Sequence, residues 1–134
     1  MSRIAVLSYD YPPNDGGISR LTSAAVSELS RRGREVEVLT LAADGRTGSS
    51  RPSVPTREVL RTLPWRDLAT YAYLRHLPTD IPVLATVWNP EATLAWLSNH
   101  AKVTVMAHGN EVMPYASGVA LGLKDRLRRR VLSA

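Results

Sequence analysis

The sequence predicts a three-layer α/β domain built on a mostly parallel sheet. Apolar runs typical of buried strands recur along the chain, the first of them at Ile4–Leu7. Segments whose apolar residues are spaced three and four apart, typical of helices, lie between these runs. Most joins are short, so the order is that of repeated βαβ units, in which consecutive strands run parallel through right-handed crossovers.

The first βαβ unit spans residues 4–41. Asp10–Gly17 follows the first strand, and its prolines and glycines end that strand. A helix begins at Ile18, and Gly33 predicts its end because glycine readily adopts the left-handed conformation of a C-cap. Glu35–Leu41 is predicted as the second strand. The residues expected on the inward face of the helix are Leu21, Ala25 and Leu29.

The middle of the chain has weaker signals. Residues 42–55 are rich in glycine, serine and proline and predict a loop. Thr56–Arg61 is interpreted as a short edge strand. Trp65–Leu77 predicts a helix that Pro78 ends. The apolar residues that cluster along this helix are Leu68, Tyr71, Ala72 and Leu74.

The next unit begins with Val83–Trp88, predicted as a central strand. Pro82 must stand at its start, because a proline deeper in the strand would remove a ladder donor. Asn89–Glu91 is a helix-start signal that combines a cap, a proline in the first turn and a carboxylate near the positive end of the helix. The helix runs to Asn99, and the residues expected to be buried in it are Leu94, Ala95, Trp96 and Leu97.

Two further elements complete the alternation. Lys102–Ala107 is predicted as another strand. Ser117 can cap a last helix, whose apolar residues recur every four positions at Val119, Leu123, Leu127 and Val131. The chain has no internal repeat, so all 134 residues are interpreted as one domain.

Composition narrows the class of protein. The 44% of hydrophobic and 22% of charged residues are typical of a globular domain. The absence of cysteine excludes disulfides, thiolate metal sites and a cysteine nucleophile. No secretory signal and no apolar stretch of about 20 residues is present, so we expect a cytoplasmic protein. The arginine-rich, lysine-poor usage is interpreted as bacterial. The net charge of +5 is compatible with phosphate, lipid or nucleic acid and selects none of them.

Ligands of open α/β sheets bind at the carboxyl ends of the strands, and three segments fall there. They are Tyr9–Gly17, Val87–Glu91 and His108–Glu111. Gly16 and Gly17 open a helix, so their backbone N–H groups could hold an anion; alternatively they only make a sharp turn. His108 could donate to a ligand hydroxyl or carry a proton; alternatively it caps the strand.

Other chemistry finds less support. His76 and His100 stand near predicted helix ends, where we expect them to meet terminal carbonyls or solvent. No histidine–carboxylate spacing indicates a metal, and we propose none. The glycine fingerprints of dehydrogenases, P-loop NTPases and serine hydrolases are absent. The basic stretch Lys124–Val131 could rest on anionic lipid, although the solvated face of a packed helix is the more common explanation.

Three separated motifs resemble one known family in the right order. Arg3–Ile18, Leu29–Thr40 and Val105–Glu111 look like the amino-terminal opening, the first helix end with its second strand, and the later His-Gly pair of family 4 glycosyltransferases. These enzymes have the GT-B fold, with two Rossmann-like domains facing across a cleft. One departure is Arg34, where the family often has a histidine after the glycine.

The resemblance implies a retaining, metal-independent transferase that moves a sugar from a nucleotide-sugar donor to an acceptor, with no other cofactor. It implies that N–H groups around Gly16 and Gly17 approach the donor diphosphate. His108 would contact the transferring sugar and stabilise positive charge at its anomeric carbon. Tyr11, Asn110 and Glu111 would line the acceptor side.

The resemblance covers about two-thirds of an acceptor-binding domain. The nucleotide-binding second domain of the family is not expected within residues 1–134, so the isolated chain is expected to be inactive. An incomplete sheet would expose an edge, and we expect self-association through it. We expect no nucleic-acid partner and leave open a peripheral contact with the inner face of the membrane. The alternatives are a non-catalytic α/β module that needs another chain, and a nucleotide-binding fold related to sugar-nucleotide epimerases.

Overall fold

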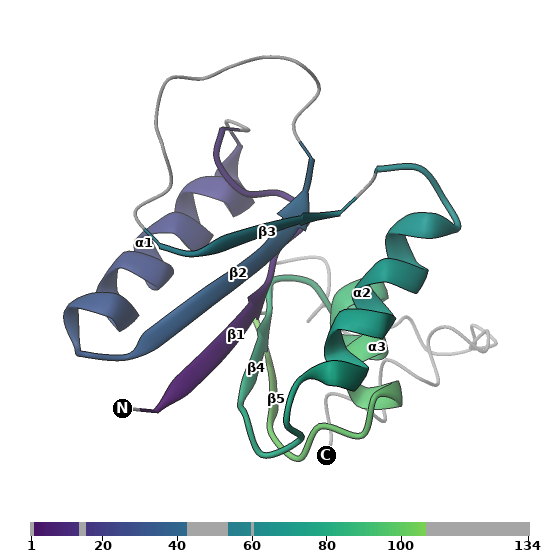
Figure 1. The fold of residues 1–134 in the computed structure, drawn as a ribbon. Helices are drawn as coiled ribbons and strands as arrows, with labels where there is room; N and C mark the ends of the chain where they lie inside the picture. Colours follow the sequence, from purple (N-terminus) through teal and green to yellow (C-terminus); the bar gives the residue numbers. More distant parts are fainter. Residues whose placement is uncertain (1, 14–15, 43–53, 60, 107–134) are drawn as a thin grey trace, which may run out of the picture.

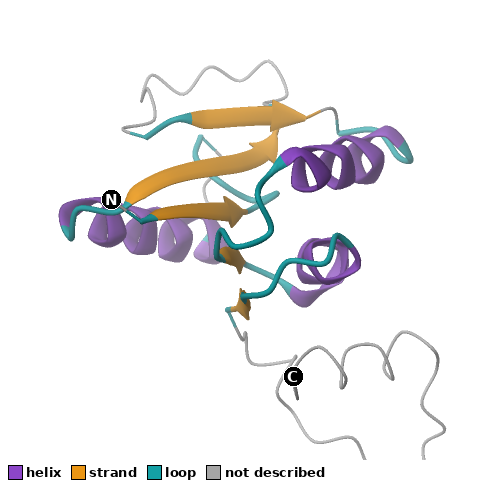
Figure 2. Ribbon diagram, turned by 60° about the horizontal axis from the view of Figure 1, so that its bottom comes forward, coloured by secondary structure: helices purple, strands orange, loops and turns teal. Residues whose placement is uncertain are grey.

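The computed structural model describes residues 2–13, 16–42, 54–59 and 61–106 and contains a five-stranded, all-parallel sheet. The strands are β1 (Arg3–Leu7), β2 (Glu35–Leu41), β3 (Thr56–Val59), β4 (Val83–Ala85) and β5 (Val103–Val105). Helix α1 (Gly17–Arg31) covers one face, and α2 (Trp65–His76) and α3 (Thr93–Leu97) cover the other (Figures 1 and 2). The predicted three-layer, Rossmann-like α/β architecture is confirmed.

The order of strands in the sheet is β3-β2-β1-β4-β5. The chain therefore moves outward from β1 to β3 and then returns to the other side of β1 to form β4 and β5. The reversal falls between β1 and β4, which pair in parallel at Val6 and Leu84. Such a reversal sends the loops after two adjacent strands to opposite faces and opens a crevice between them.

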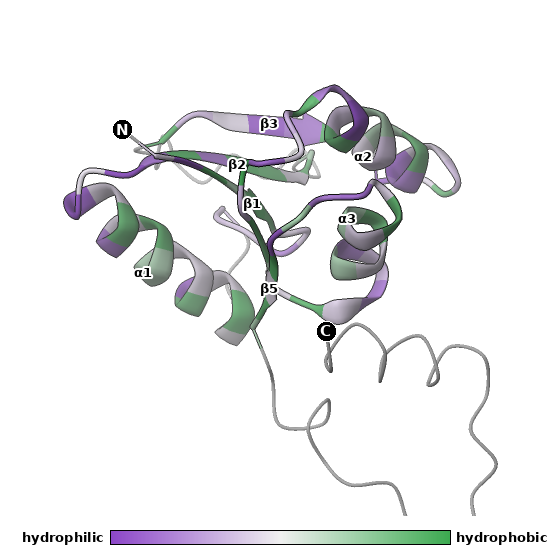
Figure 3. Cartoon of the chain, turned by 90° about the horizontal axis from the view of Figure 1, so that it is seen from below, coloured by the Kyte–Doolittle hydropathy of each residue, from purple (hydrophilic) through white to green (hydrophobic). Residues whose placement is uncertain are grey.

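Each face of the sheet has its own apolar core. Successive side chains of β1 point to opposite faces, so they contribute to the two cores in turn. Ala5 and Leu7 pack with Leu39 and Leu74 on the face covered by α2 and α3. Val6 packs with Val26 and other residues on the α1 face. Figure 3 shows the sheet lying between α1 on one side and α2 with α3 on the other, with its hydrophobic stretches in green. The unbroken apolar run of β1 therefore supplies both cores of a sheet that is covered on both sides.

Helix α1 ends where the sequence predicts. Gly33 has a φ of +77°, and the bonds from the Gly33 N–H to the Ser30 carbonyl and from the Arg34 N–H to the Leu29 carbonyl form a Schellman cap. Its inward face differs from the prediction, because Leu21 is 50% exposed and Ala25 is only half-buried. The buried residues are Ser19, Thr22 and Val26. Small residues on this face let the helix lie close to the strands.

The outer strand and α2 show a similar pattern. The predicted edge strand is confirmed as β3, which pairs with β2 alone among the described strands. Within α2, Thr70 and Leu74 are buried, whereas Leu68, Tyr71 and Ala72 are exposed. The predicted helix is therefore confirmed, and of the four apolar residues that cluster along it only Leu74 is buried.

Strand β4 is shorter than predicted because its hydrogen bonding changes after Ala85. Thr86 still donates to the Leu7 carbonyl, but the Val87 N–H turns to the carboxylate of Glu91. The chain then forms the helical turn η1 (Trp88–Ala92) and α3, in which Ala95 is buried and Leu97 is 54% exposed. The prediction that Leu97 is buried was wrong. The loop expected over 42–55 and the helix expected after Ser117 lie mostly or wholly outside the described residues.

Candidate functional site

The crevice between the carboxyl ends of β1 and β4 is the part of the fold where ligands of open α/β sheets bind. Two of the three segments that the sequence assigns to this rim are described wholly or in part: the one after β1 and the one after β4. A single side chain, Glu91, joins them.

Glu91 is 1% exposed and accepts hydrogen bonds from both strand ends. The Tyr9 N–H donates to Oε1 at 2.7 Å, and the Val87 N–H donates to Oε2 at 2.9 Å. The Thr86 hydroxyl lies 3.4 Å from both oxygens and from the Ser8 hydroxyl. We call Glu91 with these partners the Glu91 junction. It fixes the path of the backbone as it leaves β1 and β4.

The sequence indicated Glu91 only as a carboxylate in a helix's first turn. Its role as a bridge was missed, because its partner Tyr9 is 82 residues away along the chain. Asn89 has an extended backbone with φ of −133° and ψ of 122°, and Pro90 follows it, so the turn that carries Glu91 folds back beneath the end of β4. A carboxylate two residues after an asparagine that ends a buried strand is the signal that could have found it.

Tyr9 ties the junction to α2. Its hydroxyl lies 2.7 Å from the Thr70 hydroxyl and donates to Asp67 at 3.1 Å. The Arg66 guanidinium lies 4.8 Å from the centre of its ring and also bonds Asp67 at 2.9 Å. Burial, followed by the negative charge of Asp67, raises the pKa of Tyr9, so this phenol stays neutral and acts as a hydrogen-bonding group.

The two glycines at the start of α1 differ in what surrounds them. A Cβ at Gly16 would lie 3.3 Å from Oδ2 of Asp10, so the close approach of this carboxylate favours glycine there. A Cβ at Gly17 would meet no described atom within 4 Å. Neither residue has a positive φ, so a sharp left-handed turn does not account for the pair. Without a side chain, Gly17 would let a ligand come close to the backbone at the start of α1.

Tyr11 is 5% exposed and packs in the α1-side core with Val26 and Val38. Burial raises the pKa of its phenol. Packing accounts for a tyrosine at this position, and its predicted acceptor contact stays a prediction.

The remaining predicted site residues, His108, Asn110 and Glu111, lie outside the described residues. The structure therefore brings together the loops after β1 and β4 but does not test the third segment of the rim. The other two histidines behave as predicted. His76 Nδ1 lies 2.7 Å from the Ala72 carbonyl, and His100 Nε2 lies 3.0 Å from the Leu74 carbonyl, both near the end of α2.

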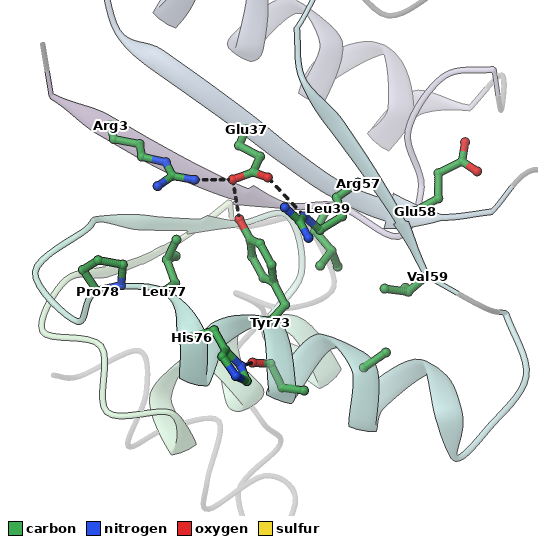
Figure 4. Close-up of a pocket in the computed structure, with 12 residues that line it drawn as sticks. Arg3, Glu37, Leu39, Arg57, Glu58, Val59, Tyr73, His76, Leu77 and Pro78 are labelled. Carbon is green, nitrogen blue, oxygen red and sulfur yellow. Dashed lines mark hydrogen bonds and ion pairs between the residues drawn. The ribbon is translucent and has the colours of Figure 1, made fainter.

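A cavity of about 580 Å³ lies elsewhere, between α2 and the part of the sheet formed by β2 and β3 (Figure 4). Glu37 projects into it from β2. Its carboxylate accepts hydrogen bonds from Arg3 at 2.6 Å, Tyr73 at 3.1 Å and Arg57 at 3.2 Å. We call these four residues the Glu37 cluster. Burial alone would raise the pKa of Glu37, but the three donors outweigh it and hold that pKa below its ordinary value.

The sequence analysis missed this cluster, although a signal was present. Glu37 interrupts an apolar strand between Val36 and Val38, and Arg3 precedes another apolar strand. In a sheet covered on both faces, a charged residue inside a strand needs a partner. The pKa of Tyr73 also reflects its place in this cluster, because burial and then the charge of Glu37 raise that pKa.

Within the part of the chain that the structure describes, no three His, Asp or Glu side chains gather closely enough to hold a metal ion. No helix among those residues is long and apolar enough to cross a membrane. Comparison with protein-family models, with curated proteins and with solved structures finds no match for this chain.

Proposed function

We propose that this chain is the acceptor-binding part of a retaining glycosyltransferase, which transfers a sugar from a nucleotide-sugar donor. The proposal starts from the three sequence motifs that resemble family 4 enzymes. The parallel Rossmann-like sheet supports it, because that fold is the one the resemblance implies. The rim between β1 and β4 is where a ligand of such a sheet would bind.

The observation that carries the proposal is the glycine start of α1, where no side chain at Gly17 stands between the backbone and a ligand. The first N–H groups of a helix have no intrahelical partner and point toward a region of positive potential, which suits a diphosphate. Gly17 is exposed, and no described atom occupies the space beside its backbone. The Glu91 junction holds the strand end from which this loop departs, so the position of α1 relative to β4 is set before any ligand arrives.

Asp10 lies at the same place. Its carboxylate is beside Gly16, with Oδ2 3.3 Å from the position that a Cβ there would take. A diphosphate bound at the start of α1 would lie close to this carboxylate. In the proposed reaction the sugar would meet His108, and further donor contacts would come from a second domain of the GT-B type.

Gly17→Ala is the experiment that tests the anion site. The added methyl meets no described atom within 4 Å, so the fold should be kept, but the methyl would stand where the diphosphate approaches. In the longest natural form that contains this sequence, we expect the affinity for UDP-glucose or GDP-mannose to fall about tenfold, the contribution of about one charge-assisted hydrogen bond. Titration calorimetry measures this, with Ser27→Ala on the exposed side of α1 as the control. Equal affinities for Gly17→Ala and the parent chain would contradict the site.

Turnover is tested on the longest natural form that contains this sequence. Sugar transfer from a panel of nucleotide sugars should fall strongly in His108→Ala, because the group that stabilises the anomeric charge is lost. Unchanged turnover would remove His108 from the mechanism.

A non-catalytic partner module is the second candidate, and one observation favours it. Leu63, Trp65 and Leu68 at the start of α2 are 64%, 61% and 54% exposed. Exposed apolar side chains gathered in this way are typical of interaction surfaces. A chain that binds no nucleotide sugar, and whose self-association in light scattering is removed by Trp65→Ser, would support this reading over the first.

A further inference from the structure

We propose that the cavity against α2 binds a small organic monoanion, a carboxylate carried on an apolar body. The cavity is distinct from the proposed diphosphate site. It lies on the α2 face of the sheet, whereas α1 and its glycine start cover the opposite face (Figure 1). Its volume of about 580 Å³ is within the range of about 300 to 1,000 Å³ that small-molecule pockets occupy.

The charges of the Glu37 cluster favour an anion. Arg3 and Arg57 flank one carboxylate, so the cluster keeps one positive charge that Glu37 does not neutralise. Arg3 bonds Glu37 through one terminal nitrogen and Arg57 through Nε, which leaves N–H groups on both guanidinium planes for a further acceptor. Glu58 also lines the cavity, but Figure 4 shows its side chain directed away from the Glu37 cluster.

The same charges favour a ligand with one negative charge. A dianion such as a phosphate monoester would be repelled by Glu37 about twice as strongly as a carboxylate, and Glu58 adds a second negative charge to the lining. A carboxylate is planar and accepts two parallel N–H groups from a guanidinium, so it matches the donors that Arg3 and Arg57 have left.

The rest of the lining favours an apolar body. Ala69 and Ala72 line the cavity from α2, together with Tyr73 and His76 of the same helix, and the two small side chains leave room above the sheet. Four further apolar residues line it: Leu39, Val59, Leu77 and Pro78. The Arg57 guanidinium lies 5.6 Å from the centre of the Tyr73 ring, so an aromatic surface also borders the charged end. A few convergent polar groups in an apolar cavity are the usual composition of a ligand site.

The probe is 2-naphthoate, titrated into the 134-residue chain and followed by the backbone amide signals of Arg57, Tyr73 and Leu77 in two-dimensional NMR. We expect saturable shifts with a Kd on the order of 1 mM, as suits a probe of this size. The neutral 2-naphthamide and the dianion 2-naphthyl phosphate should each bind about tenfold more weakly. Shifts confined to other parts of the chain, or equal binding of naphthamide, would overturn the proposal.

Two variants locate the site. Arg57→Gln replaces the guanidinium with a neutral amide. The Arg57 side chain is 63% exposed, so the fold should survive the change. Binding of 2-naphthoate should weaken about tenfold. Arg75→Gln, on the exposed side of the same helix α2, is the matched control and should bind like the parent chain. Ala72→Leu fills the cavity with the charges kept, and should abolish binding. Unchanged binding by Arg57→Gln or by Ala72→Leu would overturn the assignment.

Discussion

Two carboxylates organise this protein, and their partners differ in kind. Glu91 is 1% exposed and accepts N–H groups of the main chain from the ends of β1 and β4. The side chain of Glu37 is 13% exposed and accepts side-chain donors from Arg3, Arg57 and Tyr73. A main-chain donor cannot leave without unfolding a strand end, whereas an arginine can swing to water or to a ligand. The Glu91 junction is therefore a fixed joint, and the Glu37 cluster is a set of groups that can take a new partner.

Glu91→Gln should have the largest effect. Each carboxylate oxygen accepts one backbone N–H, so the amide nitrogen of glutamine would face a donor and leave it buried without a partner. We expect the free energy of unfolding to fall by about 2 to 4 kcal/mol in urea denaturation. Glu58→Gln, at an exposed position of β3, should change it by less than about 0.5 kcal/mol. A loss no greater than that of the control would show that the junction is not a fixed joint.

Glu37→Gln applies the same change to the other carboxylate and should cost about 1 kcal/mol, because Arg3 and Arg57 can turn to water. If the two glutamine variants were equally unstable, the distinction between main-chain and side-chain partners would fail. Thermal or urea unfolding of both variants in one buffer makes the comparison direct.

The acid dependence of stability should separate Glu37 from its glutamine variant. The pKa of Glu37 is lower in the folded chain than its ordinary value of 4.5, so its contribution is complete above that pH and is lost as the pH falls through the lowered pKa. The parent chain should lose more unfolding free energy than Glu37→Gln between pH 5 and strongly acid solution, by about 1 kcal/mol at most after solvent screening. If the unfolding free energies of the two chains fell in parallel with pH, the hydrogen bonds that Glu37 accepts would contribute nothing to stability.

Tyr73→Phe should have the smallest effect of the series. It removes one donor from Glu37 and leaves both arginines in place, so we expect a loss in the free energy of unfolding of about 0.5 kcal/mol. Tyr71→Phe, at an exposed position of the same helix, is the matched control and should cost less. A larger loss in the control would indicate that α2 packs in another orientation.

How much could be read from the sequence differed between elements. Strand β2 was predicted with its bounds intact, because its apolar run is bordered by Gly33 on one side and a polar loop on the other. The end of α1 was predicted from Gly33 for the same local reason. The inward face of α1 was not predicted correctly, since Leu21 is exposed and Val26 is buried. The angle at which a helix packs on a sheet depends on the whole of both surfaces.

The candidate sites divide in the same way. The glycines at the start of α1 were visible as a local pattern, and the structure separates Gly16, which Asp10 crowds, from Gly17, which remains open. The sequence showed Glu91 and Glu37 as charged residues but did not show that each bridges separate parts of the chain. Charge alternation inside a strand indicates that a partner is needed and does not indicate which one.

The order of strands and helices, the parallel sheet and the ends of α1 and β2 were readable from the sequence, because periodicity, glycine and proline act over a few neighbouring residues. The inward face of each helix and the partners of the two carboxylates came from the tertiary structure. Arg3 and Glu37 are 34 positions apart and Tyr9 and Glu91 are 82 apart, so the geometry of these contacts exists only once the strands have paired.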